Sequence, residues 1–207
     1  MATKYFTIGI LLCITIASIF STCKEGGLGC ANAVYSFELG IKANPDFDVI
    51  HLGDTIWLEI NSPTTFTDIA SNSMVNYSGA SNLGSAIGFG QFIGKDTVKE
   101  VANLFDYKLL NGIPVNNTFV SKIREYLFVE QQNQYLFKLG IVPKQKGIFG
   151  IGVSNAANVY RKNDNCTKAN FIINFVNTKQ HYYLNPNINS SNTDTTKPSG
   201  SYYFKVI

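Results

Sequence analysis

Hydrophobic and polar residues alternate along two stretches in the first third of the chain. Between Tyr35 and Lys42 every second residue is apolar, and residues 55–60 repeat the pattern. A period of two places successive side chains on opposite faces, so both stretches are predicted to be half-buried β-strands. Between them, Asn44-Pro45-Asp46 and Gly53-Asp54 favour turns.

Later strands are predicted wherever β-prone residues lie between turn signals. These strands are residues 86–93, 126–130, 135–139, 148–153 and 202–207. The Asn111-Gly112 pair predicts a hairpin, and the turn from Pro143 to Gly147 resembles that of the last hairpin of immunoglobulin-like domains. Residues 98–105 fit either a helix or an interrupted strand. The regular spacing of strands and turns favours a mainly β fold, an antiparallel immunoglobulin-like β-sandwich.

The pattern changes near residue 161. Four apolar residues then follow i, i+3, i+4, i+7 spacing: Ala169, Ile172, Ile173 and Val176. This spacing predicts a short helix that runs on to Tyr183. Residues 185–200 are rich in Ser, Asn and Thr, which is typical of a flexible linker. We therefore expect a sandwich over residues 34–160, followed in residues 161–207 by a short helical C-terminal extension, a linker and a terminal strand.

An apolar leader precedes the expected sandwich. Lys4 is the one charged residue among the first 22, and the nearly apolar run from Tyr5 to Phe20 is about 16 residues long. A spanning helix needs roughly 20 residues. These features predict a secretory signal peptide over residues 1–22. Two alternatives stay open, namely an uncleaved anchor and cleavage after Ala17.

The leader ends in Phe20-Ser21-Thr22-Cys23, which resembles the lipobox of bacterial lipoproteins. It departs from the usual pattern in two places, with Phe for Leu and with Thr where Gly, Ala or Ser is usual. The resemblance implies that Cys23 becomes a lipidated N-terminus carrying diacylglycerol and palmitate. Residues 23–33 would then form a tether, made flexible by three glycines.

The cysteine count agrees with lipidation. The chain has four cysteines, of which Cys13 leaves with the leader and Cys23 takes the lipid. Cys30 and Cys166 remain, and they are expected to pair in an oxidising compartment. Cleavage after Ala17 would leave three cysteines instead. The alternative for Cys30 and Cys166 is a pair of unpaired, buried thiols.

The composition and motifs of the chain limit the kinds of binding and catalytic site that it is expected to contain. Charged residues are 15% of the chain and the net charge is +3, too weak a charge to indicate nucleic-acid binding. His51 and His181 lack neighbours at metal-ligand spacing and are expected at the surface. No G-x-S-x-G nucleophile motif occurs. Gly88–Gly94 misses the dinucleotide-binding spacing, so its glycines are expected to relieve crowding in a sheet. We predict no catalytic residue, no metal and no cofactor.

Two weaker patterns involve aspartate. Asp194-Thr195 in the linker is similar to the O-glycosylation motif of Bacteroidota, which makes Thr195 a candidate acceptor. Asp46-Phe47-Asp48 offers two carboxylates, fewer ligands than calcium requires, so turn capping is favoured there.

Several stretches together resemble uncharacterised lipoproteins of Bacteroidota. They are the lipobox, Tyr35–Leu39, Gly53–Ile60, Tyr77–Ala80 and Tyr203–Val206. The resemblance implies an envelope location and a sandwich fold, and it carries over no catalytic residue. We expect a non-catalytic lipoprotein, anchored to the outer membrane through Cys23, on the periplasmic or the cell-surface side.

The expected role is that of a binding or interaction module with a protein or glycan partner. Exposed aromatic residues and the Asn-, Ser- and Gly-rich stretch 66–92 are the expected contact surface. One alternative is a structural accessory subunit of an outer-membrane complex. Another is an envelope glycan hydrolase with dispersed carboxylates.

Overall fold

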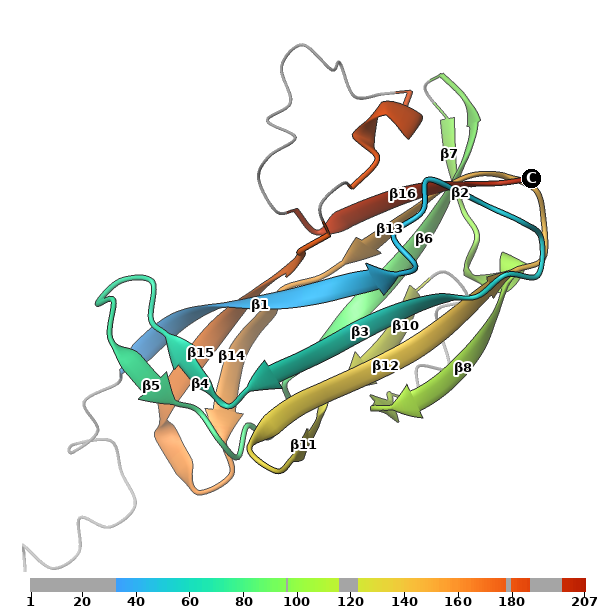
Figure 1. Ribbon diagram of the computed structural model, residues 1–207. Helices are drawn as coiled ribbons and strands as arrows, with labels where there is room; N and C mark the ends of the chain where they lie inside the picture. Colours follow the sequence, from blue (N-terminus) through green and yellow to red (C-terminus); the bar gives the residue numbers. More distant parts are fainter. Residues whose placement is uncertain (1–32, 96, 116–122, 178–179, 187–198) are drawn as a thin grey trace, which may run out of the picture. The chain divides into compact units, whose positions relative to one another are not determined.

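The computed structural model describes residues 33–95, 97–115, 123–177, 180–186 and 199–207 (Figure 1). Within these residues the strands form two seven-stranded sheets and one two-stranded hairpin. The first sheet contains β1 (Val34–Asn44), β3 (Ile56–Pro63), β8 (Phe105–Asn111), β11 (Val129–Gln131), β12 (Gln134–Pro143), β14 (Ala156–Arg161) and β15 (Asp164–Phe175). The second contains β2 (Val49–Ile50), β6 (Gly84–Gly94), β7 (Thr97–Glu100), β9 (Ile113–Pro114), β10 (Ile123–Leu127), β13 (Gly147–Val153) and β16 (Ser201–Val206). The hairpin consists of β4 (Thr65–Thr67) and β5 (Met74–Asn76).

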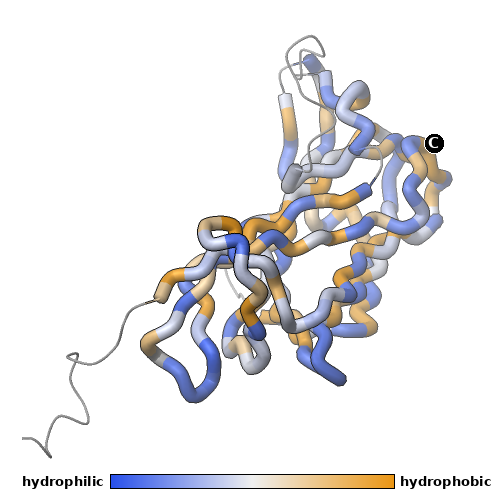
Figure 2. Tube along the Cα trace, turned by 60° about the vertical axis from the view of Figure 1, so that its left-hand side comes forward, coloured by the Kyte–Doolittle hydropathy of each residue, from blue (hydrophilic) through white to orange (hydrophobic). Residues whose placement is uncertain are grey.

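The two sheets pack face to face around one core. Rings from the first sheet contact rings from the second, as in Phe105–Phe149 and Phe175–Tyr202, whose centroids are 5.2 and 5.5 Å apart. Figure 2 shows hydrophobic and hydrophilic residues alternating along the strands. The predicted mainly β sandwich is confirmed at this level, because each sheet buries one of its faces.

The hydrogen-bonded pairs of strands define the strand order of each sheet. The first sheet runs β14-β15-β1-β3-β12, and β8 and β11 both pair with β12. The second runs β2-β16-β13-β6-β10-β9, and β7 pairs with β6. In Figure 1, β1 lies between β15 and β3. The β1–β15 and β2–β16 pairs are parallel, so the sheets are mixed rather than purely antiparallel.

The predicted C-terminal helix is wrong, since residues 164–175 form strand β15. Ala169, Phe171, Ile173 and Phe175 are all fully buried and recur with a period of two. The helical spacing left both phenylalanines out of its apolar stripe, and burying their large rings favours the strand. The described residues contain no α-helix; their helical turns are the 3₁₀ segments η1 (Ala102–Leu104) and η2 (Tyr182–Leu184).

Two turns that were predicted to form hairpins instead connect a strand of the first sheet to a strand of the second sheet. After Asn111, β8 ends in the first sheet and β9 begins in the second, because Gly112 turns the chain with a φ of +130°. The Pro143–Gly147 turn likewise joins β12 of the first sheet to β13 of the second. Residues 98–105 adopt the interrupted-strand alternative, in which β7, η1 and β8 follow one another.

The polar stretch after β3 contributes to the core as well as to the surface. Phe66 and Tyr77 are buried, and the Tyr77 hydroxyl donates to the Val159 carbonyl oxygen at 2.7 Å. The Asp68 carboxylate accepts from the Ser36 N–H at 2.9 Å. This contact satisfies a backbone donor of β1 at a position where β1 does not pair with β3.

Residues Ala33–Ile207 form one compact unit. The expected boundary after residue 160 falls inside β14, and β15 and β16 each occupy a place in one of the two sheets. In the part of the chain that the structure describes, no helix is long and apolar enough to cross a membrane. The predicted signal peptide, Cys23, Cys30 and Thr195 lie outside the described residues.

Candidate binding hollow

Cys166 is the one predicted site residue within the described part of the chain. It lies near the start of β15, and the other three cysteines of the chain lie outside the described residues. The β1–β15 register places Val34 beside Lys168, so the chain enters β1 close to Cys166. The pairing of Cys30 with Cys166 stays a prediction.

The two histidines lie in different surroundings. His51 is exposed and its Nδ1 is 3.6 Å from Asp54 Oδ2. His181 is buried, contrary to the expectation, with Nδ1 3.0 Å from the Tyr203 carbonyl oxygen and Nε2 3.8 Å from Asp46 Oδ1. Across the described residues, no group of three or more His, Cys, Asp and Glu side chains is placed to hold a metal ion.

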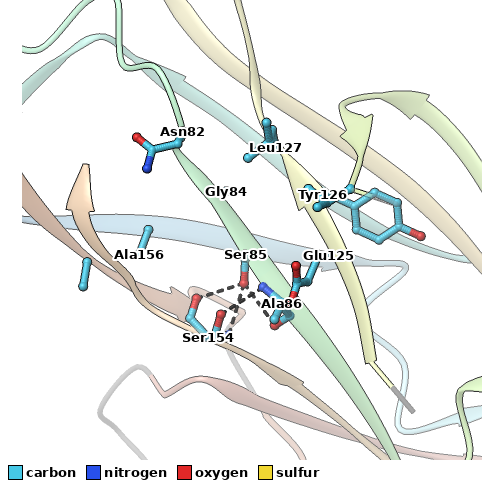
Figure 3. A pocket seen from close by; sticks show the side chains of 11 residues that line it. Asn82, Gly84, Ser85, Ala86, Glu125, Tyr126, Leu127, Ser154 and Ala156 are labelled. Carbon is cyan, nitrogen blue, oxygen red and sulfur yellow. Dashed lines mark hydrogen bonds between the residues drawn. The ribbon is translucent and has the colours of Figure 1, made fainter. Parts of the chain in front are cut away.

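A hollow of about 230 Å³ opens on the second sheet where β6 begins (Figure 3). Its residues come from the start of β6 and from Asn82 before it, from β10 and Val115 on one side, and from Ser154 and the start of β14 on the other. Ser85, Ile87 and Phe89 are buried against the core. The alternate residues Gly84 and Ala86 therefore face away from the core. Gly84 is covered by β10, because a Cβ added there would lie 2.2 Å from the Tyr126 carbonyl oxygen. The open floor therefore begins at Ala86, which has only a methyl side chain.

The floor continues as bare backbone beyond the hollow. Gly88 of β6 pairs with Gly152 of β13, and both face outward. A Cβ added at Gly88 would meet no atom within 4 Å, and one at Gly152 would meet only the Gly200 carbonyl oxygen, at 3.9 Å. Crowding therefore does not require glycine at these two positions.

The next outward pair, Gly90 and Gly150, is covered. A Cβ at Gly90 would lie 2.7 Å from the Val98 side chain, and one at Gly150 would lie 3.1 Å from the Tyr203 ring. The expectation that glycine relieves crowding is confirmed here. The open glycine floor thus ends at this pair.

Two serines fix one wall of the hollow. The Ser85 hydroxyl donates to the Ser154 carbonyl oxygen at 2.9 Å, and the Ser154 hydroxyl oxygen accepts from the Ala86 N–H at 2.9 Å (Figure 3). Ser154 N–H in turn donates to the Ser85 hydroxyl oxygen at 3.1 Å. These bonds hold the chain against β6 where it leaves β13.

Three polar groups in the hollow keep unused hydrogen-bonding capacity within the described structure. Glu125 has no partner there for its carboxylate. Asn82 accepts from the Ser81 hydroxyl at 3.1 Å through Oδ1, which leaves its NH₂ without an acceptor. Ser154 accepts through Oγ and retains its own O–H as a donor. The hollow therefore presents both donors and an acceptor to a ligand.

A second hollow, of about 250 Å³, lies beside β14. Arg161 lines it together with Asp164, and the two side chains form an ion pair. The Arg161 guanidinium also lies 5.4 Å from the centre of the Tyr77 ring. Each of the two hollows has one carboxylate side chain in its lining, Glu125 or Asp164, whereas most glycoside hydrolases use two.

No protein-family model, curated protein or solved structure matches this chain. The resemblance to Bacteroidota lipoproteins therefore stays a prediction from the sequence.

Proposed function

We propose that the chain is a non-catalytic, lipid-anchored lipoprotein of the cell envelope, whose immunoglobulin-like domain binds a partner. The observation that carries the binding role is the hollow beside β6. Ala86 and Gly88 leave its floor open, and its walls hold polar groups with unused hydrogen-bonding capacity in the described residues. Concave sites with a few convergent polar groups are typical of ligand binding.

The order of strands supports an immunoglobulin-like assignment. The path β1-β3-β12-β8 follows the A-B-E-D order of immunoglobulin constant domains, and β16-β13-β6 follows G-F-C. On this assignment β4–β5, β9–β10 and β14–β15 are insertions after strands B, D and F. The hollow then lies on strand C, between two of these insertions.

The lipid anchor is the part of the proposal that the sequence supports. Cleavage before Cys23 would leave ten residues between the lipid and Ala33, the first described residue. A glycine-rich spacer of this length allows the domain to stand off the membrane.

Labelled palmitate and detergent-phase partition test the anchor in cells that express the full chain. The wild-type protein and a Cys13→Ala control should incorporate label and enter the detergent phase. Cys23→Ala should do neither, because it lacks the thiol that forms the thioether. A Cys23→Ala protein that is still labelled, or an unlabelled wild type, would overturn the anchor.

A further inference from the structure

We infer that the bare floor of the second sheet is a groove for a neutral glycan chain. The glycine groove is defined here as Ala86, Gly88 and Gly152 together with the walls of the hollow. The inference rests on the proposed binding function and names its ligand class.

The floor offers open space in which a sugar ring can lie. Ala86 and Gly88 are successive outward positions of β6, and at a strand's rise they lie about 7 Å apart. Gly152 lies beside Gly88 and widens the floor by one strand. Because Gly88 and Gly152 have no side chain and Ala86 has only a methyl group, a sugar ring can lie close to the backbone here.

The geometry argues against an extended peptide as the ligand. Peptides that add to a sheet need an open strand edge for main-chain hydrogen bonds. Here β6 is paired on both sides, with β10 along Gly84–Gly88 and with β13 along Ile87–Phe92. A ligand on this face must therefore be recognised by contact with the floor and by side chains at the walls.

The walls suit a ligand that is rich in hydroxyl groups. Glu125 offers acceptors, the Asn82 amide offers donors, and the Ser154 hydroxyl offers one donor. A sugar hydroxyl both donates and accepts, so it can satisfy either kind of group. No lysine or arginine lines the described hollow, which argues against a phosphate-rich ligand.

Aromatic rings close the far end of the groove. Phe92 and Tyr203 lie with centroids 6.0 Å apart, and the Tyr203 ring covers Gly150, the residue two positions before Gly152. Tyr182 extends this cluster, with its centroid 5.8 Å from that of Tyr203. Tyr203 is buried, whereas Phe92 and Tyr182 are half-buried, so the apolar C–H face of a sugar ring at this end can pack against their exposed parts.

Calorimetric titration of the mature lipoprotein tests the inference, in a detergent without a sugar headgroup. The probes are neutral oligosaccharides of glucose, mannose, xylose and N-acetylglucosamine, with an uncharged Gly-Ser peptide of similar length. At least one oligosaccharide should bind with a Kd below about 1 mM. Gly88→Val should weaken that binding at least tenfold, because its side chain fills open space above the floor.

Gly94→Val is the matched control, since Gly94 is also on β6 with no atom within 4 Å of an added Cβ. It should bind within twofold of the wild type, and both variants should keep the wild-type melting temperature within a few degrees. Glu125→Gln should also weaken binding. The inference is overturned if no oligosaccharide binds, or if Gly88→Val binds as well as the wild type. Binding of the peptide alone would overturn the glycan assignment and leave the binding function standing.

Discussion

Replacing Ile172 or Ile173 by alanine tests whether residues 164–175 are a core strand. The two residues are adjacent and identical, so the changes in side-chain volume and in intrinsic propensity cancel between the variants. On β15 they point to opposite faces. Ile173 is fully buried, whereas Ile172 is half-buried and pairs with Glu38 of β1.

The expected losses differ by severalfold. Ile173→Ala removes a fully buried side chain and should lower the free energy of unfolding by about 2–5 kcal/mol. For a domain of this size that is a fall in melting temperature of roughly 4–20 °C. Ile172→Ala removes a half-buried side chain and should cost below about 1.5 kcal/mol.

Urea unfolding followed by circular dichroism measures both variants against the wild type. A helix over residues 169–176 would place both isoleucines in its apolar stripe, so it predicts similar losses. Equal losses, or a larger loss for Ile172→Ala, would refute the strand assignment and the parallel pairing of β15 with β1.

Three further predictions concern buried or hydrogen-bonded polar groups. Tyr77→Phe should lower stability by about 1–3 kcal/mol, because the Val159 carbonyl loses its donor; urea unfolding measures this. Burial raises the pKa of Tyr77 to about 12, so stability should fall as the pH rises from 10 toward 12, and less so in Tyr77→Phe. Hydrogen bonds from Thr167 and Arg161 lower the pKa of Asp164 to about 2. The stability from Asp164 is present above pH 3.8 and is lost as the pH falls toward 2, so acid titration of Asp164→Asn should show a shallower loss.

Strands could be predicted from the sequence where a single periodicity was present. Residues 35–42 alternate without a competing pattern, and they lie in β1. Residues 169–176 carry two patterns at once, and only the packing of Phe171 and Phe175 between the sheets decides between them. The pairing of β1 with β15 could not be predicted, because the paired residues, such as Val34 and Lys168, are far apart in the sequence.

The candidate site could not be predicted from the sequence either, because the sequence does not show which glycines of β6 are covered by residues of neighbouring strands. The sequence suggests that the glycines of β6 relieve crowding, which is correct at Gly90 and does not hold at Gly88. The difference depends on the partners across the sheet, since Val98 covers the first and nothing within 4 Å covers the second. Glycines alternate with buried residues in β6, and this alternation in the sequence could have indicated a sheet face with few side chains.

Intact mass of the protein extracted from membranes, with a thiol count before and after reduction, tests the account most directly. We predict one species that begins at Cys23 and carries a diacylglycerol and an acyl chain. It should have no free thiol before reduction and two after it, from Cys30 and Cys166. A chain that begins elsewhere and carries no lipid would contradict the lipid-anchored binding module.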